Sequence, residues 1–141
     1  QINSRASQKQ TMKAIKDAEA YPGPSLVIAY SPCIAHGIKG GLMKSVDQAD
    51  LATKCGYWPI YTYDPRLSEQ GKNPIKITGK APDWSRYEEF LMSENRYINL
   101  KKANPEEAER LFAQNKSDAQ FRYRQLARMA AADWSDEIEE A

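Results

Sequence analysis

An apolar run that ends in a proline and a cysteine is the feature that most constrains the fold of this chain. Residues 26–30 read LVIAY, and Ser31-Pro32-Cys33 follows directly. A short apolar run bounded by turn residues predicts a buried strand of a parallel sheet. Ligands bind outside the carboxyl ends of such strands, so Cys33 is a candidate functional thiol. One thiol cannot hold a metal centre alone, and any fellow ligands would lie outside this sequence.

The residues before this run predict a helix from about 7 to 20. Ser7 and Gln10 have the spacing of a capping box, and apolar residues then recur at helical intervals. Tyr21-Pro22-Gly23-Pro24 ends the helix, because proline cannot continue it. A helix that leads through a short loop into an apolar strand at 25–30 is half of a βαβ unit. We therefore expect an α/β fold with a parallel sheet covered on both faces.

The next segment predicts a second helix. Ser45 and Gln48 repeat the capping-box pattern, and apolar residues then follow at helical spacing from about 46 to 55. Gly56 is placed where a glycine commonly ends a helix. Cys55 lies on the apolar face, which predicts that this thiol packs in the core.

A hairpin is predicted after the second helix. Residues 57–63 alternate aromatic and β-branched side chains and predict a strand whose aromatic residues pack on a sheet face. Pro59 indicates that this strand lies at a sheet edge. Residues 75–78 predict a second strand, antiparallel to the first.

The carboxyl-terminal part predicts helices. Asp83 is the expected cap of a helix that carries Tyr87, Phe90 and Leu91. Asn104-Pro105 predicts the start of a long amphipathic helix that ends near Asp133. The acidic tail at 136–140 is expected to be frayed.

Composition and charge argue against several classes of protein. The 141 residues suit one compact domain, and the net charge of +1 argues against nucleic-acid binding, which usually needs a basic patch. No apolar stretch approaches the roughly 20 residues that span a bilayer, so we expect no membrane association. Two cysteines are too few for a disulfide scaffold and favour the reducing cytoplasm. The first residue is Gln1 rather than methionine, which indicates a piece of a longer polypeptide.

Four blocks of sequence together resemble one known family. They are GPSLVIAYSPCIAHGI at 23–38, GYWPIYTYDPRL at 56–67, GKNPIKI at 71–77, and KAPDW followed by EEFLMSENRY at 80–97. From about Ala6 to the end of the long helix, the chain resembles the carboxyl-terminal end of the pyruvate:ferredoxin (flavodoxin) oxidoreductases. The resemblance implies that residues 1–56 end a thiamine-diphosphate-binding-type α/β domain, and that residues 57–141 form the hairpin and helical arm of the same domain.

The resemblance also implies an activity, cofactors and partners. Enzymes of this family are cytoplasmic, expected to be homodimers, and cleave pyruvate with thiamine diphosphate and Mg²⁺, transferring the two-carbon unit to coenzyme A. Electrons pass through 4Fe–4S clusters to ferredoxin or flavodoxin. The cysteine of the family's S-P-C-I-x-H-G block is the fourth ligand of the cluster nearest the thiamine, and that position is Cys33 here. The other ligands are expected on the rest of the same polypeptide, so the segment alone is expected to be inactive.

From the residues alone, other interpretations of Cys33 stay open. It could be an inert buried thiol in a segment that serves as an interaction or structural module. It could also be a nucleophile activated by His36, although a histidine hydrogen-bonded to the loop backbone is the commoner arrangement. If Cys33 is a ligand, the backbone N–H groups of Ile34, Ala35 and His36 are expected to point toward cluster sulfurs.

The remaining motifs are weaker. The glycines at 37–41 lack the spacing of a phosphate-binding fingerprint and predict a flexible loop, where Lys39 or Lys44 could contact an anion. The pattern assigns no role to Arg66. The arginines of the long helix predict a solvated or interdomain face.

Overall fold

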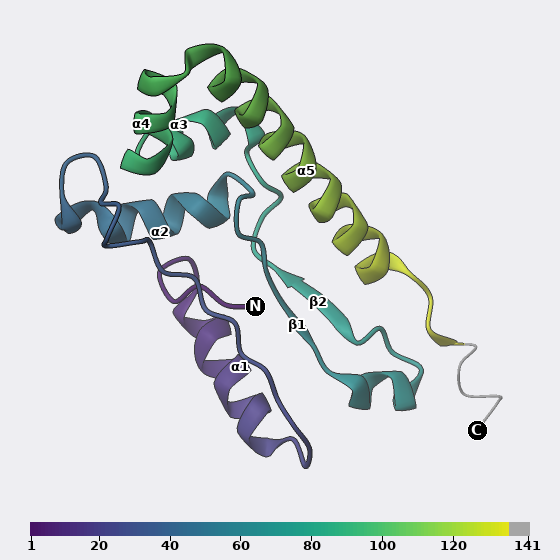
Figure 1. Cartoon of the computed structure of the whole chain (residues 1–141). Coiled ribbons are helices and arrows are strands. Elements are labelled where there is room, and N and C mark those ends of the chain that lie inside the picture. The colour runs from purple at the N-terminus through teal and green to yellow at the C-terminus, as the bar shows by residue number, and fades with distance from the viewer. Residues whose placement is uncertain (136–141) are drawn as a thin grey trace.

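Five α-helices and a two-stranded sheet make up residues 1–135, the part of the chain that the computed structural model describes (Figure 1). In chain order they are α1 (Gln8–Ala20), α2 (Ser45–Lys54), β1 (Ile60–Tyr63), β2 (Ile75–Thr78), α3 (Tyr87–Leu91), α4 (Asn95–Ala103) and α5 (Pro105–Ala131). Short 3₁₀ helices lie at Leu42–Lys44, Pro65–Gln70 and Trp84–Arg86. The mixture of helices with a small sheet agrees with a fragment of an α/β protein.

Helix α1 forms where the sequence predicts it. The Ser7 hydroxyl accepts a hydrogen bond from the Gln10 backbone N–H (3.2 Å), which satisfies one of the free donors of the first turn. The Gln10 side chain does not complete the capping box, because the Ser7 N–H donates to the Asn3 carbonyl (3.0 Å) and not to Gln10 Oε1. The helix ends at Ala20, before the proline-containing turn.

The segment predicted as a strand at 25–30 is extended, but it is not a buried strand. Its one ladder contact within residues 1–135 is a parallel bridge to Ile2. The Ile2 N–H donates to the Ile28 carbonyl (2.9 Å), and the Tyr30 N–H donates to the Ile2 carbonyl (3.1 Å). Residues 26–28 remain exposed. The prediction of a buried parallel strand is therefore wrong for this structure, because such a strand needs neighbours on both sides and the described residues supply only one short one.

The predicted hairpin is confirmed. Strands β1 and β2 pair antiparallel, with Ile60 opposite Thr78 and Tyr63 opposite Ile75. The first strand begins after Pro59 rather than at residue 57. Of the aromatic residues ahead of it, Tyr57 packs on Phe90 of α3, and Trp58 packs on Tyr30 of the extended segment.

Helix α2 begins one residue earlier than predicted, and its predicted cap is wrong. The Ser45 hydroxyl donates to the Leu42 carbonyl (2.6 Å), so it does not accept from the helix backbone. At the other end, Gly56 follows the helix with φ +87°. A Cβ at Gly56 would lie 2.5 Å from the Trp84 ring, so glycine is required by close packing as well as by backbone conformation.

The core lies between α2, α3 and α5. Its buried members are Leu51, Ala52, Cys55, Tyr87, Phe90, Leu91 and Ala119. The ring of Tyr57 lies over Phe90 with 4.4 Å between centroids and extends this cluster. The prediction that Cys55 packs in the core is confirmed.

The long helix is confirmed, and a helix before it was missed. Asn104 Oδ1 accepts from the Glu107 N–H (3.3 Å) at the start of α5, which continues to Ala131 along one side of the molecule (Figure 1). Helix α4 was not predicted, and no side chain caps its first turn. The predicted frayed tail at 136–140 lies outside the described residues. Within residues 1–135, no helix combines the length and apolarity needed to cross a membrane.

Candidate functional site at Cys33

Cys33 lies in a tight turn that follows the extended segment. The Gly37 N–H donates to the Cys33 carbonyl (3.2 Å) and closes the turn. Gly37 has φ +76°, a conformation that side-chain-bearing residues rarely adopt. Pro32 restricts the backbone just before the thiol. The turn fixes the position of the cysteine. Because the residue is only half-buried, a ligand can still reach its sulfur.

The turn stabilises the thiolate form of Cys33. The pKa of the thiol is lowered from 9.0 to about 7, first by the backbone N–H of His36, then by the His36 side chain and the backbone N–H of Ala35. The amides of Ala35 and His36 therefore act on the Cys33 sulfur itself, and their predicted contact with cluster sulfurs stays a prediction. Ile34 is not among the causes of the shift.

His36 is the closest polar side chain to the thiol. Its Nδ1 lies 3.1 Å from Cys33 Sγ. This contact differs from the expectation that the ring is satisfied by the loop backbone. A thiol and an imidazole at hydrogen-bond distance are the elements of an activated nucleophile, and an imidazole that donates to sulfur also stabilises a metal-bound thiolate.

Among the described residues, Cys33 fits the role of a thiolate ligand, but no complete metal site is present. Among residues 1–135, no group of three or more His, Cys, Asp and Glu side chains is arranged to hold a metal ion. Cys55 is fully buried, and burial raises the pKa of its thiol to about 11. Cys33, in contrast, has the lowered pKa and the neighbouring N–H groups that suit a thiolate ligand.

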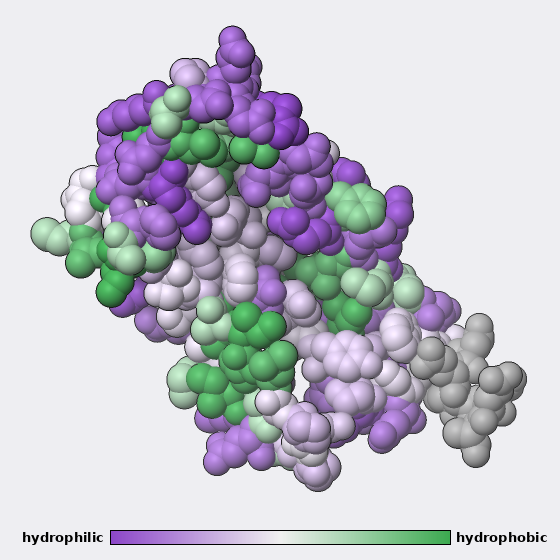
Figure 2. Space-filling model, viewed as in Figure 1, coloured by the Kyte–Doolittle hydropathy of each residue, from purple (hydrophilic) through white to green (hydrophobic). Residues whose placement is uncertain are grey.

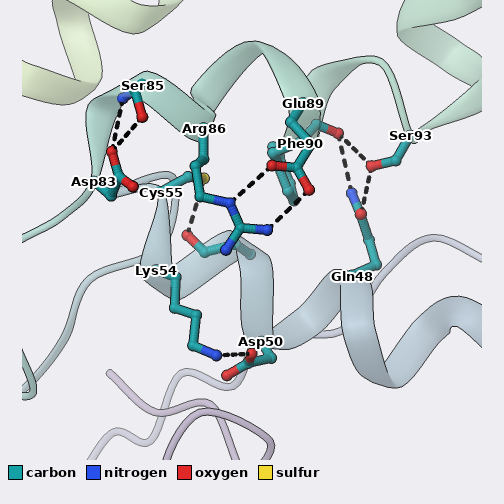
Figure 3. Close-up of polar contacts among 11 residues, drawn as sticks. Gln48, Asp50, Lys54, Cys55, Asp83, Ser85, Arg86, Glu89, Phe90 and Ser93 are labelled. Atoms are coloured by element: carbon teal, nitrogen blue, oxygen red, sulfur yellow. Dashed lines mark hydrogen bonds and ion pairs between the residues drawn. The ribbon is translucent and has the colours of Figure 1, made fainter.

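A charged cleft of about 330 Å³ lies beside the glycine-rich loop, between α2 and α3. Figure 3 shows that Arg86 points to the Glu89 carboxylate (2.8 Å) and that Lys54 pairs with Asp50. Lys44, one of the two lysines that could contact an anion, lies 3.4 Å from an Asp47 oxygen. Because acidic partners neutralise most cations of the cleft, its charge does not favour an anion.

Arg66, to which the sequence assigns no role, ties two parts of the structure together. Its guanidinium donates to both carboxylate oxygens of Asp64, at 2.9 and 2.7 Å. It also lies over the ring of Tyr21, 5.6 Å from the centroid. Arg66 therefore links the β1–β2 connection to the end of α1, where it is about 38% exposed.

Sequence comparison assigns the class and then the family. No family model matches the chain. Curated proteins do match it, and their names describe oxidoreductases: the pyruvate:ferredoxin oxidoreductase of Moorella thermoacetica is 49% identical over 125 residues, 89% of this chain and 10% of that protein. The probable pyruvate-flavodoxin oxidoreductase of Escherichia coli is 46% identical over 130 residues, 92% of this chain and 11% of that protein.

A third relative differs in its named electron acceptor. The mitochondrial pyruvate dehydrogenase [NADP(+)] of Euglena gracilis is 40% identical over 126 residues, 89% of this chain and 7% of that protein. The chain thus belongs, as a segment, to the family of pyruvate:ferredoxin and pyruvate-flavodoxin oxidoreductases, and the predicted resemblance is confirmed. It spans about a tenth of the length of the curated relatives it matches.

Proposed function

We propose that this chain is the segment of a pyruvate oxidoreductase that supplies one thiolate ligand, Cys33, to a 4Fe–4S cluster. The observation that carries the proposal is the environment of that sulfur. It lies in a closed turn, its pKa is lowered to about 7, and the backbone amides of Ala35 and His36 stabilise its negative charge. Cluster sulfurs and thiolate ligands prefer such N–H donors, which also set the reduction potential.

The proposed activity of the whole enzyme is the oxidative decarboxylation of pyruvate to acetyl-coenzyme A and CO₂, with ferredoxin or flavodoxin as electron acceptor. When bound, 4Fe–4S clusters supply one-electron transfer, and thiamine diphosphate with Mg²⁺ supplies carbanion stabilisation. The described residues contribute a fixed ligand position rather than substrate contacts. Pro32 and the closed turn hold Cys33, and His36 supplies a polar contact to its sulfur (3.1 Å).

Further parts of the proposal concern the whole protein. The segment is proposed to be the carboxyl-terminal part of a thiamine-diphosphate-binding-type domain, divided at residue 56 into the end of the sheet domain and its hairpin and helical arm. The remaining cluster, thiamine and Mg²⁺ ligands lie on the rest of the polypeptide. A cytoplasmic homodimer is the proposed assembly.

The decisive experiment replaces Cys33 by serine in the full-length enzyme. We expect Cys33→Ser to lose the iron, labile sulfide and visible absorbance of one cluster, together with most pyruvate-dependent ferredoxin reduction. Cys55→Ala is the matched control, because that thiol is buried away from the turn and the variant should keep full cluster content. Full iron content in Cys33→Ser would contradict the assignment.

A thiol nucleophile is the second candidate, and the 3.1 Å contact between Cys33 Sγ and His36 Nδ1 favours it. The same variant separates the candidates. A nucleophile predicts that Cys33→Ser keeps all its iron but loses activity. An inert thiol in a structural module predicts that both iron and activity are retained.

A further inference from the structure

Glu94 is a buried carboxylate that the proposed function leaves unused. The residue is 2% exposed and lies just before α4. Burial of an ionised carboxylate is costly unless donors surround it. The burial of the Glu94 carboxylate therefore indicates that specific polar partners surround it.

The partners of Glu94 come from three different segments. Oε1 accepts from the Tyr30 hydroxyl (3.3 Å) at the end of the extended segment and from Gln48 Nε2 (3.2 Å) on α2. Oε2 lies 2.7 Å from Nε of Arg96, on α4. A carboxylate has only acceptor sites, so Oε1 can accept from both neutral donors while Oε2 forms an ion pair with Arg96 that lacks hydrogen-bond alignment.

The backbone around Glu94 holds the other end of the Cys33 turn. Ile38 and Glu94 form an antiparallel bridge. The Lys39 N–H donates to the Ser93 carbonyl (2.8 Å), and the Asn95 N–H donates to the Gly37 carbonyl (3.2 Å). Figure 3 shows Gln48 reaching the Phe90 carbonyl and the Ser93 hydroxyl, so the same strip of α3–α4 is also fastened to α2.

The residues on both sides of Cys33 thus attach to one short strip. Tyr30, three residues before the thiol, is held by the Glu94 side chain, and residues 37–39 are held by the backbone at 93–95. Between these points, the turn has few contacts of its own, and Ile34, Ala35 and His36 are exposed. The position of the Cys33 sulfur is therefore determined by the attachments before and after the turn.

We propose that Glu94 is a positioning residue that fixes the turn carrying Cys33 against α2 and α4. It does not touch the proposed cluster: its side chain acts through Tyr30, and its position is fixed by the backbone bonds that the residues on either side of it make with 37–39. Where the inference concerns the cluster, it rests on the proposed function. The tethering of the turn stands on the side-chain contacts of Glu94 and on the backbone bonds at 93–95.

The test uses the full-length enzyme and Glu94→Gln, which keeps the shape but places an amide donor opposite one of the existing donors. Glu107→Gln is the matched control, because Glu107 pairs with Arg110 on the exposed face of α5. Hydrogen exchange of peptides covering residues 31–41 is expected to become about tenfold faster in Glu94→Gln and to stay unchanged in the control.

A second readout follows the metal centre rather than the backbone. Glu94→Gln is expected to retain full iron content but to shift the electron paramagnetic resonance signal and midpoint potential of one cluster. Wild-type exchange at 31–41 together with a wild-type spectrum would overturn the inference. If Glu94→Gln does not fold, Tyr30→Phe removes a single donor, and the exchange of the same peptides should still accelerate. No acceleration in Tyr30→Phe would then overturn it.

The two proposals fail in different ways. If Cys33→Ser keeps its iron while Glu94→Gln loosens residues 31–41, the cluster assignment is wrong and the tethering is right. If Cys33→Ser loses a cluster while Glu94→Gln leaves both hydrogen exchange and spectrum unchanged, the cluster assignment is right and the tethering by Glu94 is wrong.

Discussion

Helix α3 and residues 26–28 of the extended segment each carry three large apolar side chains, and the two sets differ in their burial. Those of α3 are almost wholly buried: Tyr87 (1% exposed), Phe90 (0%) and Leu91 (1%). Those of the extended segment face outward: Leu26 (83% exposed), Val27 (40%) and Ile28 (44%).

The neighbours of the two segments explain the difference. Helix α3 packs against α2 and α5, which cover its apolar side chains. The extended segment has the short bridge to Ile2 on one side, and α1 beside it exposes Met12 and Ile15. Figure 2 shows a hydrophobic patch in this part of the molecule. An apolar sequence favours burial of a segment, but the side chains are buried only where other elements pack over them.

The largest contrast is expected between Phe90→Ala and Leu26→Ala in the 141-residue chain. Phe90 has no exposed surface, so truncation removes its transfer free energy and leaves a cavity, at a cost of about 3–5 kcal/mol in the free energy of unfolding. Leu26→Ala is expected to change it by less than about 0.5 kcal/mol, because the side chain is already in water. Urea denaturation of both variants measures the difference.

The same pair sharpens the comparison in the full-length enzyme. If the rest of the polypeptide covers residues 26–28, Leu26→Ala should there cost about 2 kcal/mol or more. Equal costs for Leu26→Ala in the chain and in the full-length enzyme would show that this surface stays exposed.

Alanine substitutions at two glycines distinguish the cost of overpacking from the cost of backbone strain. Gly56 and Gly41 both have φ +87°, but a Cβ at Gly56 would lie 2.5 Å from the Trp84 ring, and a Cβ at Gly41 would meet nothing within 4 Å. Gly41→Ala should cost about 1–3 kcal/mol from the backbone conformation alone, because φ +87° with ψ 175° is essentially restricted to glycine. Gly56→Ala adds overpacking of about 1–3 kcal/mol to its own backbone strain, for a total near 2–6 kcal/mol. Thermal unfolding that shows equal losses would contradict a packed junction between α2 and Trp84.

The helices could be predicted from the sequence where their signals are local. Ser7 and Asn104 accept from the first-turn amides of α1 and α5, and each signal lies within four residues of its partner. Ser45 has the same pattern but bonds backward to Leu42, because the preceding residues form a 3₁₀ turn. Helix α4 has no side-chain cap, so the sequence carries no local signal for where it begins.

The site could be predicted only in part. Cys33 and His36 are three residues apart, so their contact was foreseeable as one of the alternatives. Glu94 meets Tyr30 across 64 residues and Gln48 across 46, and no local pattern encodes such pairs. The burial of residues 25–30 was predicted wrongly, because it depends on strands that the described residues do not supply.

The two cysteines extend the comparison to reactivity. The pKa of Cys33 is lowered to about 7 by N–H donors of its turn, whereas burial raises the pKa of Cys55 to about 11. In the iron-free chain, alkylation of Cys33 should rise through pH 7 and level off near pH 8, because the thiolate reacts. From ionisation alone, Cys55 should react roughly 10–20-fold more slowly at pH 8, after allowing for the greater intrinsic nucleophilicity of a high-pKa thiolate, and its burial should slow it further.

Mass spectrometry of time-resolved iodoacetamide labelling measures both rates in one sample. Labelling in guanidinium is the control, since unfolding removes the turn and the core and should bring the two rates together. Comparable native rates would indicate that Cys55 is not held in the core described above, and a Cys33 rate that rises only above pH 9 would contradict a stabilised thiolate.

The smallest effect is expected where the hairpin meets the end of α5. Asn73 Nδ2 donates to the carbonyls of Met129 (2.8 Å) and Ala132 (3.0 Å), while its Oδ1 accepts from the Ile75 N–H (2.8 Å). Asn73→Ala should cost about 1 kcal/mol, since water can replace part of these exposed bonds. Asn73→Asp keeps the acceptor but sets a negative charge against the carbonyl end of the helix, so it should cost at least as much at pH 7.

Lowering the pH distinguishes a charge effect from a lost hydrogen bond at this junction. Protonation of the introduced carboxyl below about pH 4 removes the repulsion, so the deficit of Asn73→Asp relative to Asn73→Ala should shrink there. Gln114→Ala, which breaks an exposed contact to Asp118 within α5, should change stability by no more than a few tenths of a kcal/mol. If Asn73→Ala is as neutral as Gln114→Ala, the hairpin is not fastened to α5 through this side chain, and the contact between β2 and α5 alone holds the two together.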